Sequence, residues 1–209
     1  NLAVNRMNDG QFVYNFTLIV EDSGCDATTA AASAQSLADS GVSGIIGPAC
    51  DAATNSAMQV AAVENIPLIS YASTSPALST DADDGYLWRV VASTAYEGIA
   101  AATWAQLAQI SNAAVLAKNS TAEAPIAQAF IATAAAAGVQ LCYTSFYSED
   151  TTDFSSDVGA IKSAGCDGVF LVSEFADGSD IIEELDAQEL LGEDGITVVG
   201  HGGIGDEAF

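Results

Sequence analysis

The stretch that most constrains the fold is residues 44–80, where two short apolar runs flank an alanine-rich segment. The first run, residues 42–46, is bounded by glycines, which is typical of a buried parallel strand. The alanine spacing over residues 52–63 predicts a helix. Pro67 directly precedes the second run, residues 68–70, and a strand tolerates proline at its start. The stretch therefore predicts a β-α-β unit.

Both predicted strands end in loops of small, hydroxyl-bearing and acidic residues. Asp51 follows the first strand, and Ser73 and Thr74 follow the second. Open α/β sheets bind small molecules at the carboxyl ends of their strands. We therefore expect a small-molecule site at this edge.

The rest of the chain repeats the alternation of strands and helices. Further strands are predicted over residues 13–20, 86–91, 113–117, 140–147, 169–173 and 196–200. Further helices are predicted over residues 1–8, 28–40 (with Asp26 as N-cap and Gly41 as its end), 95–109, 122–137, 154–164 and 179–191. Such alternation predicts parallel sheets in an α/β fold. The elements form two blocks, residues 1–92 and 93–209, which we interpret as two lobes.

The composition is strongly acidic, which limits the classes of partner. The chain has 28 Asp and Glu residues against 4 Lys and Arg residues, a formal net charge of −24. Binding nucleic acid requires clustered cations, and the four basic residues are scattered, so we expect no nucleic-acid partner. An anionic membrane surface would also repel the chain. The acidity is typical of a protein kept soluble, including at high salt, and an alternative is a role in concentrating cations.

No run of 18 apolar residues occurs, so no membrane span is predicted. No signal peptide is recognisable either. Residues 1–8 resemble the middle of a helix, and the chain stops just past a strand and a glycine loop. We therefore expect a fragment of a longer protein that lacks the first strand and the C-terminal return of its fold.

Catalysis, metal binding and cofactor binding find no support in the residue pattern. The single histidine, His201, has no recognisable nucleophile–base partner, and no C-x-x-C motif occurs. The glycine-rich residues 200–205 match neither the phosphate-binding loop nor the dinucleotide-binding pattern. We therefore expect no enzyme activity, no metal and no cofactor. The four cysteines lack zinc spacing and by number allow three disulfide pairings, which export would favour forming.

Six short motifs occur in order along the chain: Leu2–Asn8, Glu21–Asp26, Ile45–Cys50, Ile66–Leu78, Trp88–Arg89 and Asp153–Phe154. Together they resemble the type I periplasmic substrate-binding proteins of the branched-chain amino acid ABC transporter family. The resemblance covers essentially the whole chain. It implies two lobes of parallel sheet flanked by helices, which bind a small molecule between them and close on it by a hinge motion.

The resemblance also implies particular ligand contacts. Lobe one is expected to hold a ligand carboxylate with backbone N–H groups and hydroxyls, and lobe two to provide aromatic and acidic contacts for an ammonium group. The corresponding positions are Asp51, Ala72, Ser73 and Thr74 in lobe one, and Ala122, Glu174, Phe175 and Gly202 in lobe two. Ala122 and Gly202 stand where the family usually has a tyrosine and an acidic residue.

Several of these positions also have a structural interpretation that involves no ligand. Asp51 replaces the family's usual serine, and its carboxylate would repel a ligand carboxylate unless it caps the following helix and turns away. Ser73 and Thr74 could be turn residues, and Glu174 a solvated loop acid. The fold therefore carries over better than the amino acid specificity.

The positions of the cysteines, together with the resemblance, favour two disulfides. Cys25 and Cys50 each lie just past the carboxyl end of a predicted strand, and the resemblance supports their pairing. Cys142 and Cys166 lie near the amino ends of neighbouring predicted strands. We therefore expect the pairs Cys25–Cys50 and Cys142–Cys166.

These expectations combine into one function with one alternative. The chain is interpreted as a periplasmic or extracellular binding protein that delivers an amino acid or related small polar solute to the membrane subunits of an ABC importer. The alternative is a ligand-sensing ectodomain of a membrane receptor with the same fold. The two would differ in the sequence that follows the binding lobes.

Overall fold

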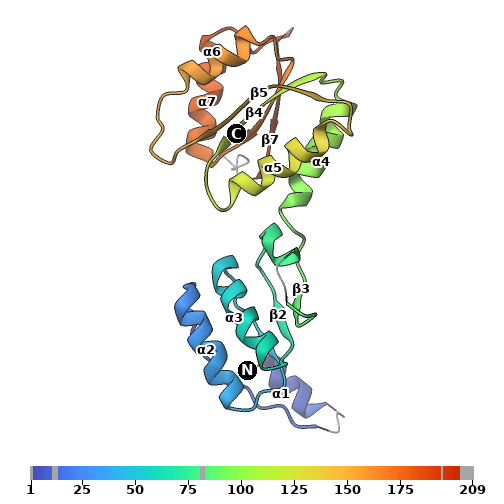
Figure 1. Ribbon diagram of the computed structural model, residues 1–209, viewed down its shortest axis with the longest axis vertical. Coiled ribbons are helices and arrows are strands. Elements are labelled where there is room, and N and C mark those ends of the chain that lie inside the picture. The colour runs from blue at the N-terminus through green and yellow to red at the C-terminus, as the bar shows by residue number, and fades with distance from the viewer. Residues whose placement is uncertain (1, 11–13, 81–82, 194, 203–209) are drawn as a thin grey trace. The chain divides into compact units, whose positions relative to one another are not determined.

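The computed structural model describes residues 2–10, 14–80, 83–193 and 195–202 of the chain. The chain divides into two compact units, residues 1–91 and 92–209. Each unit contains one parallel sheet with helices packed against it, as the alternation of strands and helices predicts (Figure 1). None of the helices in these ranges combines the length and the apolar composition of a membrane span.

Unit 1 is built on a three-stranded parallel sheet of order β1-β2-β3. Its elements are α1 (Leu2–Asp9), α2 (Ala27–Asp39), β1 (Ile45–Ile46), α3 (Asp51–Val63), β2 (Leu68–Ser70), the 3₁₀ helix η1 (Pro76–Ser79) and β3 (Leu87–Arg89). Helices α2 and α3 lie side by side, and their small residues pack with Ile45 and Leu68 in one core (Figure 1). The alanine-rich composition of both helices allows this close approach.

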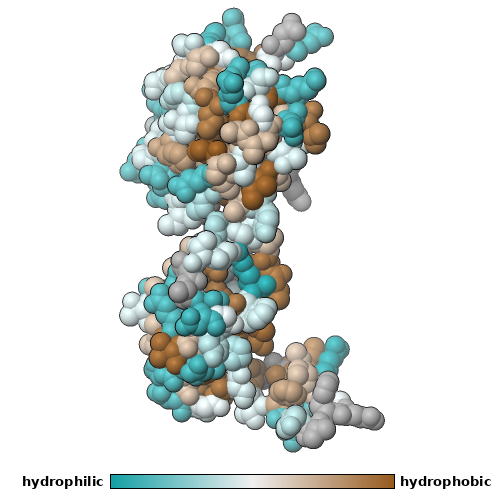
Figure 2. Space-filling model, turned by 45° about the vertical axis from the view of Figure 1, so that its right-hand side comes forward, coloured by the Kyte–Doolittle hydropathy of each residue, from teal (hydrophilic) through white to brown (hydrophobic). Residues whose placement is uncertain are grey.

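The other face of this sheet carries exposed apolar side chains. Ile46, Ile69 and Trp88 are in register across β1, β2 and β3. Their exposed fractions are 80%, 40% and 63%, because side chains alternate between the two faces of a strand and the helices cover the opposite face. Hydrophobic residues therefore reach the surface of unit 1 (Figure 2).

Local sequence signals set the ends of α2. The Asp26 side chain accepts a hydrogen bond from the Thr29 backbone N–H at 2.8 Å, so the predicted N-cap is confirmed. These bonds to Thr29 also hold the pKa of Asp26 below its usual value. Gly41 follows the helix with a φ of 71°, a left-handed conformation that glycine adopts without steric cost.

The strand predicted over residues 13–20 is wrong for Tyr14–Val20, and residue 13 lies outside the described residues. Tyr14–Val20 has β propensity but pairs with no strand among the described residues, and its apolar side chains are exposed. In the described part of the chain, β1, the next strand in sequence, pairs only with β2. A strand exists only where another strand satisfies its backbone groups, so propensity alone did not decide this segment.

Unit 2 is built on a four-stranded parallel sheet of order β5-β4-β6-β7. Its elements are α4 (Ala95–Leu107), β4 (Asn112–Lys118), α5 (Glu123–Ala134), β5 (Gln140–Tyr147), α6 (Ser155–Ser163), β6 (Gly168–Val172), α7 (Phe175–Ala187) and β7 (Thr197–Gly200). The two central strands, β4 and β6, are buried over almost their whole length. Such continuous apolar strands are typical of a sheet covered on both faces.

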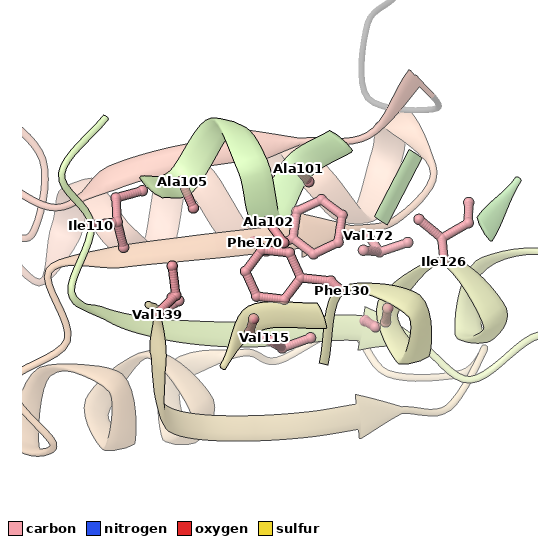
Figure 3. Close-up of a cluster of buried hydrophobic side chains, with 14 residues drawn as sticks. Ala101, Ala102, Ala105, Ile110, Val115, Ile126, Phe130, Val139, Phe170 and Val172 are labelled. Atoms are coloured by element: carbon pink, nitrogen blue, oxygen red, sulfur yellow. The ribbon is translucent and has the colours of Figure 1, made fainter. Parts of the chain in front are cut away.

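Each face of this sheet has its own core. Val115 and Phe170 point toward α4 and α5, where the rings of Phe130 and Phe170 stack with centroids 4.6 Å apart (Figure 3). The alternate residues Leu116 and Leu171 pack instead against α6 and α7. Unit 2 is therefore a three-layer α/β/α sandwich.

The helix predicted over residues 179–191 begins and ends four residues earlier than expected. In the structure Glu174 is its N-cap, Phe175 is its first residue, and Gln188 follows its end. Gly178 weakens helix propensity, yet here it is buried within α7, and its N–H donates to the Glu174 carbonyl at 2.9 Å. Packing against the sheet therefore outweighed local propensity and moved Glu174 to the start of a helix.

The structure contains the two expected disulfides. Cys25 is joined to Cys50 and Cys142 to Cys166, with Cα–Cα distances of 5.4 and 5.8 Å. The predicted Cys25–Cys50 bond is present, although the segment before Cys25 is not the strand from which the pairing was partly predicted. Each bond ties together segments about 25 residues apart, which the chain-entropy account values at about 3 kcal/mol.

Candidate functional site

The carboxyl edge of the unit 2 sheet carries a polar side chain at every strand. Lys118 and Tyr147 are the last residues of β4 and β5, and Ser173 and His201 follow β6 and β7 directly. Because the strands are parallel, these four residues emerge at one edge of the sheet. This is the edge at which open α/β sheets bind small molecules.

Lys118 forms the electrostatic centre of this edge. Its Nζ lies 3.0 Å from Oε2 of Glu174, the N-cap of α7. It also lies 3.3 Å from Oδ2 of Asp177, in the first turn of that helix. The Lys118 side chain is 9% exposed, whereas that of Glu174 is 66% exposed. The hydrogen bond to Glu174 and the one to Asp177 raise the pKa of Lys118, so the ammonium form is favoured.

Tyr147 extends this cluster toward the other side of the sheet edge. Its Oη donates to Asp177 Oδ2 at 3.3 Å, and its ring meets Phe154 edge-on with centroids 5.0 Å apart. Burial, followed by the charge of Asp177, raises the pKa of Tyr147, so the phenol stays protonated. Asp177 thus accepts from both Lys118 and Tyr147.

His201 links the ends of two strands to a helix. Its Nε2 donates to the Ser173 carbonyl at 2.8 Å, and its Nδ1 lies 3.7 Å from Glu97 Oε2 in the first turn of α4. The side chain is 8% exposed. These contacts hold His201 directly after β7, and the next residue, Gly202, lies at the surface beside Glu97.

The loop between β4 and α5 is held by a reciprocal cap. The Ser120 hydroxyl accepts from the backbone N–H groups of Ala122 and Glu123, each at 3.1 Å, and also contacts the Glu123 carboxylate. Glu123 is buried and Ala122 is exposed. The loop therefore has a defined shape with Ala122 on its outer side.

In unit 1 a buried network of hydroxyls fixes the equivalent edge. The hydroxyls of Thr54 and Ser73 lie 2.6 Å apart, and Ser73 also donates to the Ala49 carbonyl at 3.0 Å. Ser70 donates to the Pro48 carbonyl at 2.8 Å. The three hydroxyl-bearing residues are almost completely buried. The Ser73 hydroxyl is therefore committed to holding the loops after β1 and β2 together.

Asp51 and Arg89 hold the backbone of Ser75, two residues after Ser73, from two sides. An Asp51 carboxylate oxygen accepts from the Ser75 backbone N–H at 3.0 Å, and Arg89 Nη1 donates to the Ser75 carbonyl at 2.8 Å. The N-cap of α3 is Cys50, and Asp51 is the first helical residue, so the capping interpretation of Asp51 is wrong. Its carboxylate orients the Ser75 backbone, which the sequence pattern did not reveal because the two residues are 24 apart.

A pocket of about 400 Å³ opens on unit 1 beside the loop after β1. It is lined by residues 21–25, by α2 and β1, by the loop after β1 and by Tyr71. Ala72 and Thr74 do not line it; Ala72 is exposed and Thr74 is half-buried at the carboxyl edge. Of the predicted contact residues of unit 1, Ala72 therefore lies at the surface, Asp51 and Thr74 are half-buried, and Ser73 is buried.

The structure therefore brings some predicted residues together within each unit. Asp51 lies beside the loop that carries Ala72, Ser73 and Thr74. In unit 2, Glu174 and Phe175 share the start of α7, whereas Ala122 and Gly202 lie on separate loops. Among the described residues, no group of His, Cys, Asp and Glu is arranged to hold a metal ion.

Sequence reasoning missed Lys118, Asp177 and Tyr147, which make the central contacts of unit 2. Lys118 had a recognisable signal, because it ends a continuous apolar strand where a charge needs a partner. The partners come from α7, more than 50 residues away, and only the fold identifies them. In unit 1, likewise, only the fold identifies the hydrogen-bond partners of Thr54, Ser70 and Arg89.

Comparisons with known proteins identify related folds. A family model described as "Periplasmic binding protein" matches residues 1–208. No curated protein matches the chain significantly. Among solved structures, a putative branched-chain amino acid ABC transporter protein from Rhodospirillum rubrum is 20% identical with a TM-score of 0.76, covering 95% of this chain and 57% of that one.

Two further solved structures show the same likeness. A substrate-binding protein from Desulfitobacterium hafniense in complex with Leu is 20% identical with a TM-score of 0.72, covering 95% of this chain and 59% of that one. A solute-binding protein from Rhodopseudomonas palustris BisB5 in complex with 3,4-dihydroxybenzoic acid is 20% identical with a TM-score of 0.66, covering 97% and 56%. The chain therefore spans less than two thirds of the length of these structures, and at this identity the likeness establishes the fold.

Proposed function

Because the chain belongs to the periplasmic binding protein family, we propose that it is an extracytoplasmic solute-binding protein that captures an amino acid or related small polar solute. The observation that carries this proposal is the family match, which covers residues 1–208. The family consists of binding proteins, so the proposal involves binding without turnover. Its partner would be the membrane subunits of an ABC importer.

The chemistry of the two sheet edges supports this proposal. In unit 1 we assign ligand contacts to the Thr74 side chain and to the backbone at Ala72, with Ser73 fixing the loop and Asp51 orienting it. In unit 2 we assign them to Glu174 and Phe175, with backbone contacts at Ala122 and Gly202. Glu174 is mostly exposed and can accept from a ligand ammonium or hydroxyl while it stays near Lys118.

The related structures suggest which solutes to test first. One was solved with Leu and another with 3,4-dihydroxybenzoic acid, and both ligands carry a carboxylate. A hydroxyl donor such as Thr74 can bind a carboxylate or carbonyl oxygen. We therefore propose that the ligand carries a carboxyl or carbonyl group for unit 1 and an ammonium or hydroxyl group for unit 2.

A thermal-shift screen tests the proposed function. The panel comprises amino acids, their amides, polyamines and hydroxybenzoates, each at matched pH and ionic strength because the protein is highly charged. A ligand present at 100 times its Kd stabilises the folded state by about 2.7 kcal/mol, which raises the melting temperature by several degrees. Isothermal titration calorimetry then checks that a hit binds with a defined stoichiometry.

The control is sodium chloride at the same ionic strength. A compound that raises the melting temperature no further than this salt is scored as inactive. If no member of the panel exceeds the salt control while both disulfides are intact, the chain does not bind these solutes. Conversion of any compound during incubation would contradict binding without turnover.

A further inference from the structure

The charges around Lys118 at the carboxyl edge of unit 2 do not cancel. One ammonium faces two carboxylates, Glu174 at 3.0 Å and Asp177 at 3.3 Å from its Nζ. We propose that Asp177 is a positioning residue that neutralises Lys118 and so leaves Glu174 as a surplus carboxylate, which selects a positively charged ligand group. The assignment rests on the proposed function and narrows it to solutes that carry an amine.

Asp177 is the carboxylate that stays on Lys118. Its side chain is 19% exposed, and the oxygen that faces the ammonium, Oδ2, also accepts from the Tyr147 hydroxyl at 3.3 Å. Tyr147 is itself buried, with its ring packed against Phe154. Moving Asp177 away would leave both a largely buried ammonium and a buried hydroxyl without this acceptor, which is unfavourable.

Glu174 is the carboxylate that can exchange partners. Its side chain is 66% exposed, and its contact with Lys118 uses Oε2 alone. No residue in the described part of the chain forms a hydrogen bond with its other oxygen, Oε1. Water and salt screen an exposed ion pair, so the pairing with Lys118 holds Glu174 only weakly. A ligand can therefore bind Glu174 while Asp177 keeps Lys118 neutralised.

The remaining charges near this edge do not remove the surplus. Glu123 at the start of α5 and Glu97 beside His201 add negative charge, and a protonated His201 would balance only Glu97. Lys162 is the other basic residue of unit 2, and it donates to the Gln188 carbonyl at the C-terminal end of α7. The N-terminus of α7 contributes only about half a positive charge.

The surplus charge distinguishes an ammonium group from a hydroxyl group of similar size. An ammonium bound to Glu174 brings the total charge of Lys118, Glu174, Asp177 and the ligand group to zero. A hydroxyl leaves that total negative, and a carboxylate makes it more negative. Attraction between opposite charges at contact distance therefore favours the amine.

Titration calorimetry on the full-length protein at low salt tests this selectivity. The probes are leucine, valine, glutamine and lysine, each compared with the 2-hydroxy acid of the same carbon skeleton. We expect an amino acid to bind at least about tenfold more tightly than its hydroxy acid. A hydroxy acid or a hydroxybenzoate that binds while the amines do not overturns this assignment and leaves the proposed function standing. Binding of no solute at all overturns both.

Charge variants separate the positioning role from a structural one. Asp177→Asn leaves Lys118 to neutralise Glu174, so the affinity for the amino acid should fall about fivefold to twentyfold. Lys118→Met also removes a contact of the cluster but makes it more negative, so this variant should bind at least as tightly as the wild type. The double variant again has Glu174 as its surplus carboxylate and should return to within about threefold of the wild-type affinity.

The matched control is Asp157→Asn. Asp157 lies in the first turn of α6 and accepts from the Tyr143 hydroxyl at 2.7 Å, so its substitution makes the same change of charge beside a different tyrosine. Its affinity should stay within about twofold of the wild type. Circular dichroism checks that each variant is folded, and the double variant decides if Asp177→Asn is not. Equal weakening by Lys118→Met and Asp177→Asn, or no rescue in the double variant, overturns the proposal.

Discussion

At the carboxyl end of β4, Lys118 places an ammonium group next to two carboxylates that differ in exposure. The side chain of Asp177 is 19% exposed and also accepts from Tyr147, whereas that of Glu174 is 66% exposed. Exposed ion pairs contribute about 0–1 kcal/mol because water and salt screen them. The contact with Asp177 should therefore matter more for stability, and Glu174 remains available to a ligand.

This difference predicts unequal effects of substitution. Lys118→Met and Asp177→Asn should each lower the free energy of unfolding by about 1–3 kcal/mol, because a largely buried partner loses its hydrogen bond. Glu174→Gln, the matched exposed control, should change it by less than about 1 kcal/mol. Urea denaturation at neutral pH measures all three. Equal losses for Asp177→Asn and Glu174→Gln would contradict the assignment.

The raised pKa of Lys118 predicts a pH dependence with a definite sign. A folded-state pKa above the ordinary value of 10.5 means that the folded state holds the proton more tightly. The resulting stability is complete below pH 10.5 and is lost as the pH rises through the folded-state pKa. The stability difference between wild type and Lys118→Met should therefore shrink above pH 10.5. Denaturation curves between pH 9 and 12 test this, and a constant difference would refute it.

The proposed ligand contacts predict effects on affinity. Once a ligand is known, Thr74→Ala and Glu174→Gln should each weaken binding by about 1–3 kcal/mol, the cost of leaving a buried polar group unpaired. Calorimetry measures this change. Unchanged affinity in both variants, with the fold intact, would move the site elsewhere.

Asp51 allows a sharper test at the same edge. Its carboxylate accepts from the Ser75 N–H, so Asp51→Ser should lower the melting temperature. If the variant instead binds leucine or valine more tightly, Asp51 determines specificity. Parallel melting and titration experiments separate the two roles.

At the scale of elements, the packing of α4 on α5 depends on one glycine. A Cβ atom added at Gly98 would lie 2.7 Å from the Phe130 backbone nitrogen and still closer to the Ile126 carbonyl. These are backbone atoms of α5 and cannot rotate away. The Phe130–Phe170 stack lies in the same core, so a displaced α5 would disturb it (Figure 3).

Gly98→Ala should therefore destabilise unit 2 by about 1–3 kcal/mol, which is typical of overpacking. Gly159→Ala in α6 is the matched control, because the added atom would meet only Gln188 Oε1 at 3.7 Å. That change should stabilise the protein by up to about 1 kcal/mol, since alanine favours a helix over glycine. Thermal unfolding of both variants measures the contrast. Stabilisation by Gly98→Ala would show that α4 and α5 are not in close contact.

For the whole molecule, the charge of −24 gives long-range self-repulsion. The Debye length falls from about 10 Å at 0.1 M salt to about 3 Å at 1 M, so added salt should relieve that repulsion. The melting temperature should therefore rise with sodium chloride. Sucrose at equal osmolality is the control for solvent exclusion. A flat or falling curve in salt would show that the acidic surface does not limit stability.

The sequence by itself determined the architecture of both units. Alternation of short apolar runs with alanine-rich segments predicts parallel α/β sheets, and β2 (Leu68–Ser70) and β5 (Gln140–Tyr147) begin and end where expected. The Asp26 cap was also predictable, because it depends on a residue three positions away. These features follow from periodicity and local hydrogen bonding, which neighbouring residues define.

Only the tertiary structure decided features that depend on distant partners. Tyr14–Val20 has the residues of a strand but pairs with no strand that the structure describes, and α7 begins at Phe175 because packing buries Gly178. The hydrogen bond from Lys118 to Glu174 spans 56 positions, and the bond between Asp51 and Ser75 spans 24. Backbone pairing, burial and ion pairing depend on which surfaces meet in space, and residue order alone does not fix that.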